Sequence, residues 1–182
     1  MARLQELILA VTAALVLAAG CTFSSVKPEM SGTPPPQPPK TLVVGDIKVT
    51  DPIWESYRLH FTRGLFEWFK RNGGFDAVVE AAPATPAPDS IVLTGTITEV
   101  DKGSTALRWI VGMGAGQAKV KGDFEIRSPA GEVLARFSGR ESYLGGAGIG
   151  GAGFLDMEDL VRRFAETIAQ ATRGWARGET PK

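Results

Sequence analysis

The strongest constraint on the fold is a strict alternation of residue types between positions 118 and 139. From Ala118 the chain reads Ala-Lys-Val-Lys-Gly-Asp-Phe-Glu-Ile-Arg, with small or apolar residues at even positions and mostly charged residues at odd positions. After residues 128–131, the apolar side is taken up again by Val133, Ala135, Phe137 and Gly139. A period of two residues is that of a β-strand with one buried face. This stretch therefore predicts a β-hairpin.

The loop at residues 128–131 also predicts a register for this hairpin. The expected cross-strand pairs are Ile126–Val133, Phe124–Ala135 and Gly122–Phe137, which keep one face apolar. On the other face, the same register places Arg127 across from Glu132 and Asp123 across from Arg136. A slip by one residue would bury these charged side chains, so the alternation disfavours it.

The elements on either side of the hairpin complete a fold. Residues 41–50, 75–81 and 91–103 read as strands. Residues 52–72 form a helix pattern that Gly73-Gly74 ends, and residues 155–174 form a second. We expect an α+β fold with a single mixed or antiparallel sheet of about five strands and two helices packed on one face, in the order β-α-β-β-β-β-α.

The N-terminus is typical of an exported protein. A short polar start precedes an apolar run from Leu7 to Ala19, which is shorter than the roughly 20 residues of a spanning helix. The run ends in Leu-Ala-Ala-Gly-Cys21, which resembles the lipobox of bacterial lipoproteins. The resemblance implies that residues 1–20 are a signal peptide, that cleavage falls between Gly20 and Cys21, and that Cys21 carries a diacylglycerol anchor and palmitate. The alternative is an ordinary secretory signal with an incidental cysteine.

Residues 21–40 read as a lipid-anchored, proline-rich tether, followed by a small α/β domain at residues 41–178. The tether contains Pro34-Pro-Pro-Gln-Pro-Pro39 and few apolar residues, which predicts an extended, solvated spacer. Thr22, rather than Asp, follows the cysteine. In Gram-negative lipoproteins this pattern favours the outer membrane, so we expect a cell-envelope protein attached through its lipid to the periplasmic side of that membrane.

Composition excludes several classes of function. Lys+Arg and Asp+Glu both number 20, so no nucleic acid partner is indicated. Cys21 is the only cysteine and His60 the only histidine, which leaves no thiolate cluster, few zinc sites and no usual nucleophile–base pair. The carboxylates Asp156, Glu158 and Asp159 are better explained by the dipole at a helix start than by catalysis. We therefore expect no catalytic residue, no metal and no cofactor.

Two glycine-rich regions are the remaining candidates for a site. Residues 146–151 spell G-x-G-x-x-G, but a dinucleotide fold would need another strand beyond the following helix, and the expected compartment has no obvious supply of dinucleotides. Neither region lies in an apolar run long enough to span a membrane. They are tight loops or, alternatively, a contact surface. The candidate contact residues are Arg108, Trp109, Ile110, Gly112, Gly114, Gly116, Gly145, Gly146, Gly148, Gly150 and Gly151.

Several of these motifs together resemble a known family. The order Leu93-Thr-Gly-Thr-Ile-Thr, Leu107-Arg-Trp-Ile-Val-Gly-Met-Gly-Ala-Gly116, Gly131-Glu-Val-Leu and Gly145-Gly is similar to the bacterial domain-of-unknown-function family 4410, over roughly residues 41–174. The resemblance implies a small envelope lipoprotein and brings no established activity. By analogy of fold, such domains look like those of periplasmic translocation and curli-secretion lipoproteins, which work through assembly.

Three hypotheses about function follow. The first is a non-enzymatic outer-membrane lipoprotein that binds another envelope protein or forms a homo-oligomer through the two glycine-rich regions. The second is a small-ligand or glycan-binding periplasmic domain that uses the same loops and Arg108. The third and least favoured is an envelope hydrolase that uses carboxylates such as Glu99 and Asp101.

Overall fold

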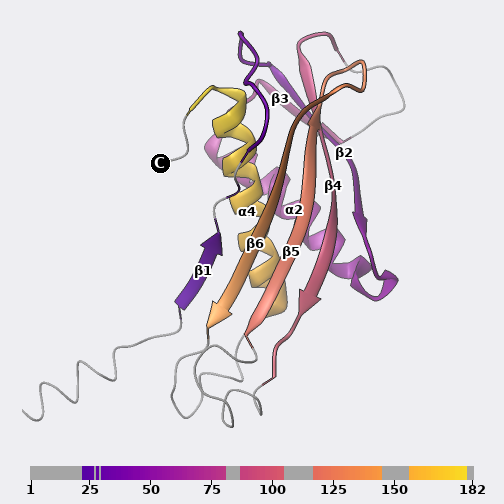
Figure 1. The fold of residues 1–182 in the computed structure, drawn as a ribbon, viewed down its shortest axis with the longest axis vertical. Helices are drawn as coiled ribbons and strands as arrows, with labels where there is room; N and C mark the ends of the chain where they lie inside the picture. The colour runs from indigo at the N-terminus through magenta and orange to yellow at the C-terminus, as the bar shows by residue number, and fades with distance from the viewer. Residues whose placement is uncertain are drawn as a thin grey trace, which may run out of the picture.

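The computed structural model describes residues 22–26, 28, 30–80, 87–104, 117–144 and 156–179. These form one mixed sheet and two long helices (Figure 1). The strands are β1 (Thr22–Val26), β2 (Thr41–Val49), β3 (Ala77–Glu80), β4 (Ser90–Asp101), β5 (Ala118–Arg127) and β6 (Val133–Leu144). The helices are α2 (Glu55–Asn72) and α4 (Met157–Ala176), and a 3-10 turn, η1 (Pro52–Trp54), precedes α2.

The sheet runs in the order β1-β6-β5-β4-β2-β3. β2 is parallel to both β3 and β4, and the other neighbours are antiparallel. Both helices lie behind the sheet in Figure 1, where α2 packs against β2 and α4 against β5 and β6. The predicted α+β fold, with two helices on one face, is confirmed. Within the described residues the sheet has six strands, because β1 joins the five that were expected.

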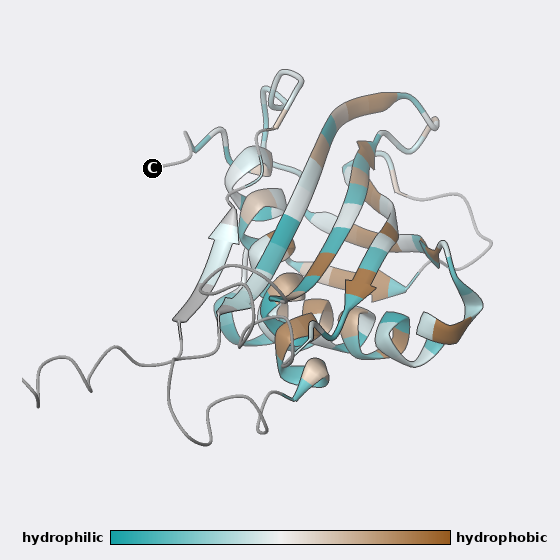
Figure 2. Cartoon of the chain, turned by 60° about the horizontal axis from the view of Figure 1, so that its bottom comes forward, coloured by the Kyte–Doolittle hydropathy of each residue, from teal (hydrophilic) through white to brown (hydrophobic). Residues whose placement is uncertain are grey.

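The core lies between the sheet and the two helices. Hydrophobic and hydrophilic residues alternate along the strands, as the bands in Figure 2 show. At the centre, the rings of Phe61 from α2, Phe124 from β5 and Phe164 from α4 have centroids 5.5 to 5.8 Å apart. The ring of Phe124 lies over Gly95 and Gly122, where an added β-carbon would fall 2.2 and 2.9 Å from ring atoms. These two glycines let an aromatic ring lie directly on the backbone of the sheet.

The predicted register of the β5–β6 hairpin is wrong by two residues. Ile126 pairs with Ala135, Phe124 with Phe137 and Gly122 with Gly139. One residue of the shift comes from the turn, which holds five residues, 128–132, because Arg127 pairs with Val133. The other comes from a bulge between Ile126 and Arg127 that leaves Leu134 as an extra residue on β6. A shift of two preserves the buried face, so the apolar pattern could not detect it. The expected charge pairs change with the register, and Glu125 now faces Arg136 while Asp123 faces Ser138.

The segment before β2 also differs from the solvated spacer that its composition predicts. β1 pairs with the edge of β6, and Ser31 exchanges two backbone hydrogen bonds with Arg136, at 2.9 and 3.2 Å. Gly32, at φ +108°, packs so tightly that a β-carbon would fall 2.0 Å from the carbonyl oxygen of Leu134. The physical reason is that an open strand edge offers backbone hydrogen bonds, which a segment poor in apolar residues can still use.

Candidate functional site

The residues predicted to form the lipid site and the contact surface lie outside the described residues. These are Gly20 and Cys21, and the glycine-rich residues Arg108, Trp109, Ile110, Gly112, Gly114, Gly116, Gly145, Gly146, Gly148, Gly150 and Gly151. Their roles stay predictions. The described strands do fix where the chain leaves the sheet. Thr22 lies opposite Leu144, and Tyr143 opposite Ala118, so β1 begins, β6 ends and β5 begins at one end of the sheet.

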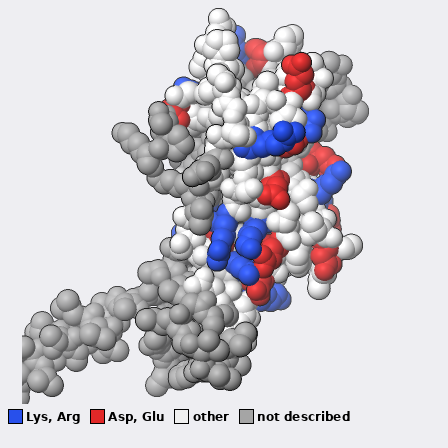
Figure 3. Space-filling view, in the orientation of Figure 1, with Lys and Arg blue, Asp and Glu red and all other residues white. Residues whose placement is uncertain are grey.

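At this same end, the uncovered face of the sheet carries a cluster of ion pairs (Figure 3). The carboxylate of Glu99 on β4 lies 2.7 Å from the ammonium groups of both Lys119 and Lys121 on β5, and Asp101 lies 3.9 Å from Lys119. Hydrogen bonds from Lys119 and then Lys121 hold the pKa of Glu99 below its ordinary value. Glu99 and Asp101, which have no evident partner in the sequence, are therefore paired across strands. A carboxylate stabilised in its charged form is poorly suited to act as a general acid.

A second cluster lies further along the same face, toward the β5–β6 turn. Glu125 accepts a hydrogen bond from Arg136 Nε at 2.8 Å and also pairs with Arg127. The Arg136 guanidinium, followed by that of Arg127, lowers the pKa of the Glu125 carboxyl. Ser138 Oγ donates to Asp123 at 2.6 Å. Most of the charged side chains named on this face are therefore paired with one another.

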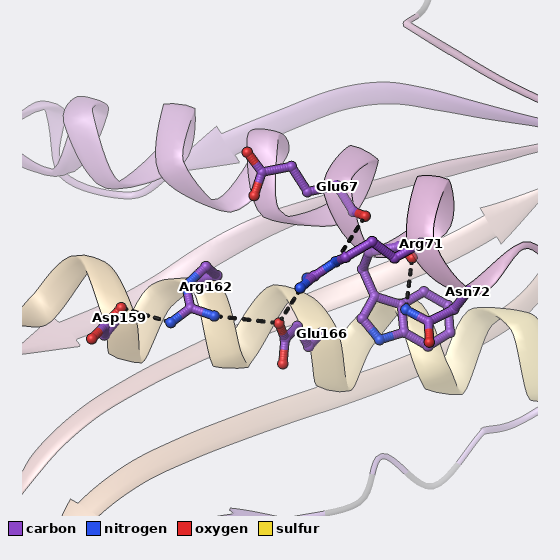
Figure 4. A network of polar contacts seen from close by, with 7 residues as sticks. Glu67, Arg71, Asn72, Asp159, Arg162 and Glu166 are labelled. Carbon is purple, nitrogen blue, oxygen red and sulfur yellow. Dashed lines mark hydrogen bonds and ion pairs between the residues drawn. The ribbon is translucent and has the colours of Figure 1, made fainter.

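The two helices are joined by a further polar network (Figure 4). Arg162 of α4 donates to Asp159 at 2.7 Å and to Glu166 at 3.5 Å, and Arg71 of α2 donates to Glu166 at 3.2 Å. The hydrogen bond to Asp159 raises the pKa of Arg162. Nearby, a β-carbon on Gly64 would fall 3.0 Å from that of Ala165, which shows how closely α2 and α4 approach. This network ties one helix to the other.

A shallow polar hollow opens beside this network, between the start of α4 and the middle of α2. His60 Nε2 lies there 3.3 Å from Glu158 Oε1, so the lone histidine does have a carboxylate partner. Asp156 is the N-cap of α4 and accepts from the Glu158 amide at 2.9 Å, which confirms its predicted role at the helix start. The lining has no hydroxyl or thiol nucleophile, and no metal-binding group of three His, Cys, Asp or Glu occurs in the described ranges. The remaining lining residues are Arg63, Gly64, Glu67, Asp159 and Arg162.

Glu141 is an unusual residue that was not among the predicted site residues. Glu141 is 1% exposed and lies on the apolar face of β6, directly across from Ser25 of β1. Its Oε2 atom accepts hydrogen bonds from Ser25 Oγ of β1 at 2.5 Å and from Thr167 Oγ1 of α4 at 3.2 Å. The signal was present, because the alternation that buries Ala135, Phe137 and Gly139 also places position 141 inward. Glu141 thus joins three elements through one buried carboxylate.

Part of the chain matches a known family of protein domains. Residues 67–147 match a domain of unknown function, DUF4410. The family resemblance predicted from the sequence is confirmed over these residues, a shorter range than the expected 41–174. The DUF4410 match runs from the second half of α2 to just beyond β6, and so includes β3, β4 and the β5–β6 hairpin. No curated protein is significantly similar in sequence to the chain.

A solved structure shares the fold. A PelC dodecamer from Paraburkholderia phytofirmans is similar with a TM-score of 0.52 and 15% identity, over 87% of this chain and 100% of that chain. A single-substitution variant of that dodecamer gives 0.47 and 17%, over 81% and 98%. Rare lipoprotein B from Shewanella oneidensis gives 0.36 and 20%, over 76% and 95%. The first similarity concerns the fold alone, and the other two scores are too small to add to it.

Among the helices that the structure describes, none combines the length and the apolar character needed to cross a bilayer.

Proposed function

We propose that this chain is a non-enzymatic lipoprotein of the outer membrane, whose domain is presented in the periplasm and works by assembling with copies of itself. The observation that carries the proposal is the fold shared with the PelC dodecamer, which extends over the whole of that chain. The DUF4410 match and the Leu-Ala-Ala-Gly-Cys21 motif support the envelope and lipoprotein parts.

The described polar groups support a role in binding rather than catalysis. Glu99 and Asp101, the carboxylates that a hydrolase would use, face lysines on the neighbouring strand. The hollow beside His60 lacks a nucleophile in its lining. Assembly instead requires a surface, and we propose that the two glycine-rich regions and Arg108 supply it.

Lipidation is tested by metabolic labelling with palmitate and by membrane fractionation. We expect the full-length protein to carry the label and to sediment with outer membranes, and Cys21→Ala to lose the label because the chain has no other cysteine. A labelled Cys21→Ala variant, or an unlabelled wild-type protein, would contradict the lipoprotein part of the proposal.

Assembly is tested separately by native mass spectrometry of the detergent-extracted protein and by photo-crosslinking from positions 110 and 149. We expect a discrete oligomer and self-adducts from both positions. The control is a probe at Gln170, which lies exposed on α4. If all three probes return only monomer, and the extract is monomeric, self-assembly is excluded.

A further inference from the structure

The segment that joins the predicted lipid site to the domain is itself part of the sheet. β1 begins one residue after Cys21 and runs antiparallel to β6, from Thr22 opposite Leu144 to Val26 opposite Arg140. Beyond β1, Ser31 pairs with Arg136, and Trp175 Nε1 of α4 donates to the carbonyl of Gly32 at 3.5 Å. With this segment in place, the lipid would be attached directly at the end of the sheet.

The contact that holds β1 is unusual because it is built around a buried carboxylate. Glu141 is 1% exposed, and Ser25 lies directly opposite it in the β1–β6 register. A carboxylate removed from water is stable only when hydrogen bonds replace its hydration. Ser25 and Thr167 supply such bonds, and both reach the same oxygen, Oε2. If β1 separates from β6, Glu141 loses the hydrogen bond from Ser25, because Ser25 belongs to β1, whereas Thr167 belongs to α4.

A buried carboxylate at this contact lowers the free-energy cost of undocking β1, compared with an apolar residue at the same position. When β1 separates from β6, Glu141 loses its hydrogen bond to Ser25 but becomes accessible to water, which favours the charged group. An apolar side chain at position 141 would gain nothing from such exposure. Ser24 and Ser25 add little apolar burial that would oppose separation, because both are exposed. A short edge strand of this kind belongs to the low-stability part of a fold.

We propose that Ser25, Glu141 and Thr167 form a latch that sets the distance between the domain and the membrane. With the latch closed, β1 is docked and the domain stands directly at the lipid. With the latch open, residues 22–30 become a free tether, up to the Ser31–Arg136 pairing, that can extend about 30 Å at roughly 3.3 Å per residue. The membrane part of this proposal rests on the lipidation of Cys21 proposed above, whereas the latch itself does not.

Two adjacent serines provide a matched test of the latch. Ser25 points toward Glu141, whereas Ser24 pairs with Ser142 on the opposite face and contributes only its carbonyl oxygen, to the Ser142 hydroxyl. In hydrogen–deuterium exchange of the non-lipidated protein, we expect Ser25→Ala to speed exchange across residues 22–26 by about tenfold, the typical worth of a hydrogen bond to a charged group. Ser24→Ala should leave exchange across residues 22–26 unchanged. In both variants, exchange of the amides in β4 and β5 should stay as in the wild-type protein.

Repeating the two serine substitutions in a Glu141→Ala variant separates loss of the Ser25–Glu141 hydrogen bond from a general folding defect. In Glu141→Ala the acceptor is absent, so Ser25→Ala should then add no more than Ser24→Ala does. If Ser25→Ala and Ser24→Ala behave alike in the wild-type background, or if Ser25→Ala keeps its full effect without Glu141, the latch is refuted.

The membrane arm uses the lipidated protein in phospholipid vesicles, with a donor dye on Val79→Cys and acceptor dyes on the lipid headgroups. We expect lower energy transfer for Ser25→Ala than for Ser24→Ala, because an open latch lets the domain move away. Equal transfer in the two variants would refute the distance role. A protein that carries no lipid would refute the proposed function instead, while the exchange experiment would still report on the latch.

Discussion

The apolar face of the sheet is built in two different ways at its centre and at its β6 edge. At the centre, Phe124 stacks on Phe61 and Phe137 and reaches Phe164, with centroid distances of 5.5 to 5.8 Å. At the edge, the residue in the equivalent inward position is Glu141, held by two hydroxyl groups. One strand pattern thus produces both a permanent core and a polar contact that can open. The alternation of a strand determines which side chains face inward. Whether those side chains are apolar or charged determines how much free energy is needed to separate that region from its neighbours.

Phe124→Ala tests the central region and should have the largest effect. It removes a ring that touches both helices and the neighbouring strand, so we expect a loss of about 3 to 5 kcal/mol in the free energy of unfolding. Chemical denaturation followed by circular dichroism measures this loss. The control is Ile53→Ala, whose side chain is 74% exposed and should change stability by less than about 0.5 kcal/mol. Equal effects of the two substitutions would contradict the assignment of the core.

Thr167→Val tests the edge region and should have an intermediate effect. It keeps the shape of the side chain but removes one of the two hydroxyl donors to Glu141, so we expect a loss of about 1 to 2 kcal/mol in the same assay. Thr172→Val is the matched control in the same helix. Its hydroxyl donates only to the Ile168 carbonyl of its own helix, so its removal should be nearly neutral. If Thr172→Val costs as much as Thr167→Val, Glu141 does not depend on its hydroxyl partners.

Glu125→Gln probes the solvent face, which belongs to neither region, and should have the smallest effect. The pKa of Glu125 is lowered in the folded protein, so its contribution is present above the unfolded value, near 4.5, and is lost as pH falls through the lower folded value. We expect Glu125→Gln to cost a few tenths of a kcal/mol at about pH 7 and nothing near pH 2. Denaturation at the two pH values, with Glu132→Gln as the control, measures the difference. A cost that grows on acidification would contradict the assigned direction.

The sequence predicted the faces of the elements better than their pairing. The helix predicted at residues 155–174 is confirmed as α4, and Leu160, Val161, Phe164 and Ile168, which recur at its 3.6-residue period, are buried. The hairpin register was missed because a turn one residue longer than expected and the bulge at Leu134 together move the pairing by two residues, which leaves every apolar residue on its predicted face. Parity therefore identifies the face but not the partner.

Pairings at the edge were harder to predict because they depend on backbone rather than side-chain burial. Thr-Phe-Ser-Ser-Val is short and its two apolar residues do not alternate as in a half-buried strand, so its place beside β6 becomes evident only when that edge is known. Glu99 and Asp101 had no partner in the linear sequence, since the irregularity between Ile97 and Glu99 determines which lysines face them. Of the candidate site, the residues in the glycine-rich regions stay predictions, and Glu141 could have been found by extending the alternation.

The placement of β1 and Ser31 on β6 also affects how the protein can be handled outside its membrane. A version that starts at Thr41 would retain both helices and strands β2 to β6, yet the edge of β6 would present unpaired backbone groups and the uncovered Glu141. Exposed strand edges recruit other strands and lead to aggregation. Within residues 22–40, β1 and Ser31 thus cover the open edge of β6. Removing this segment as if it were only a linker would leave a domain prone to non-native aggregation through that edge.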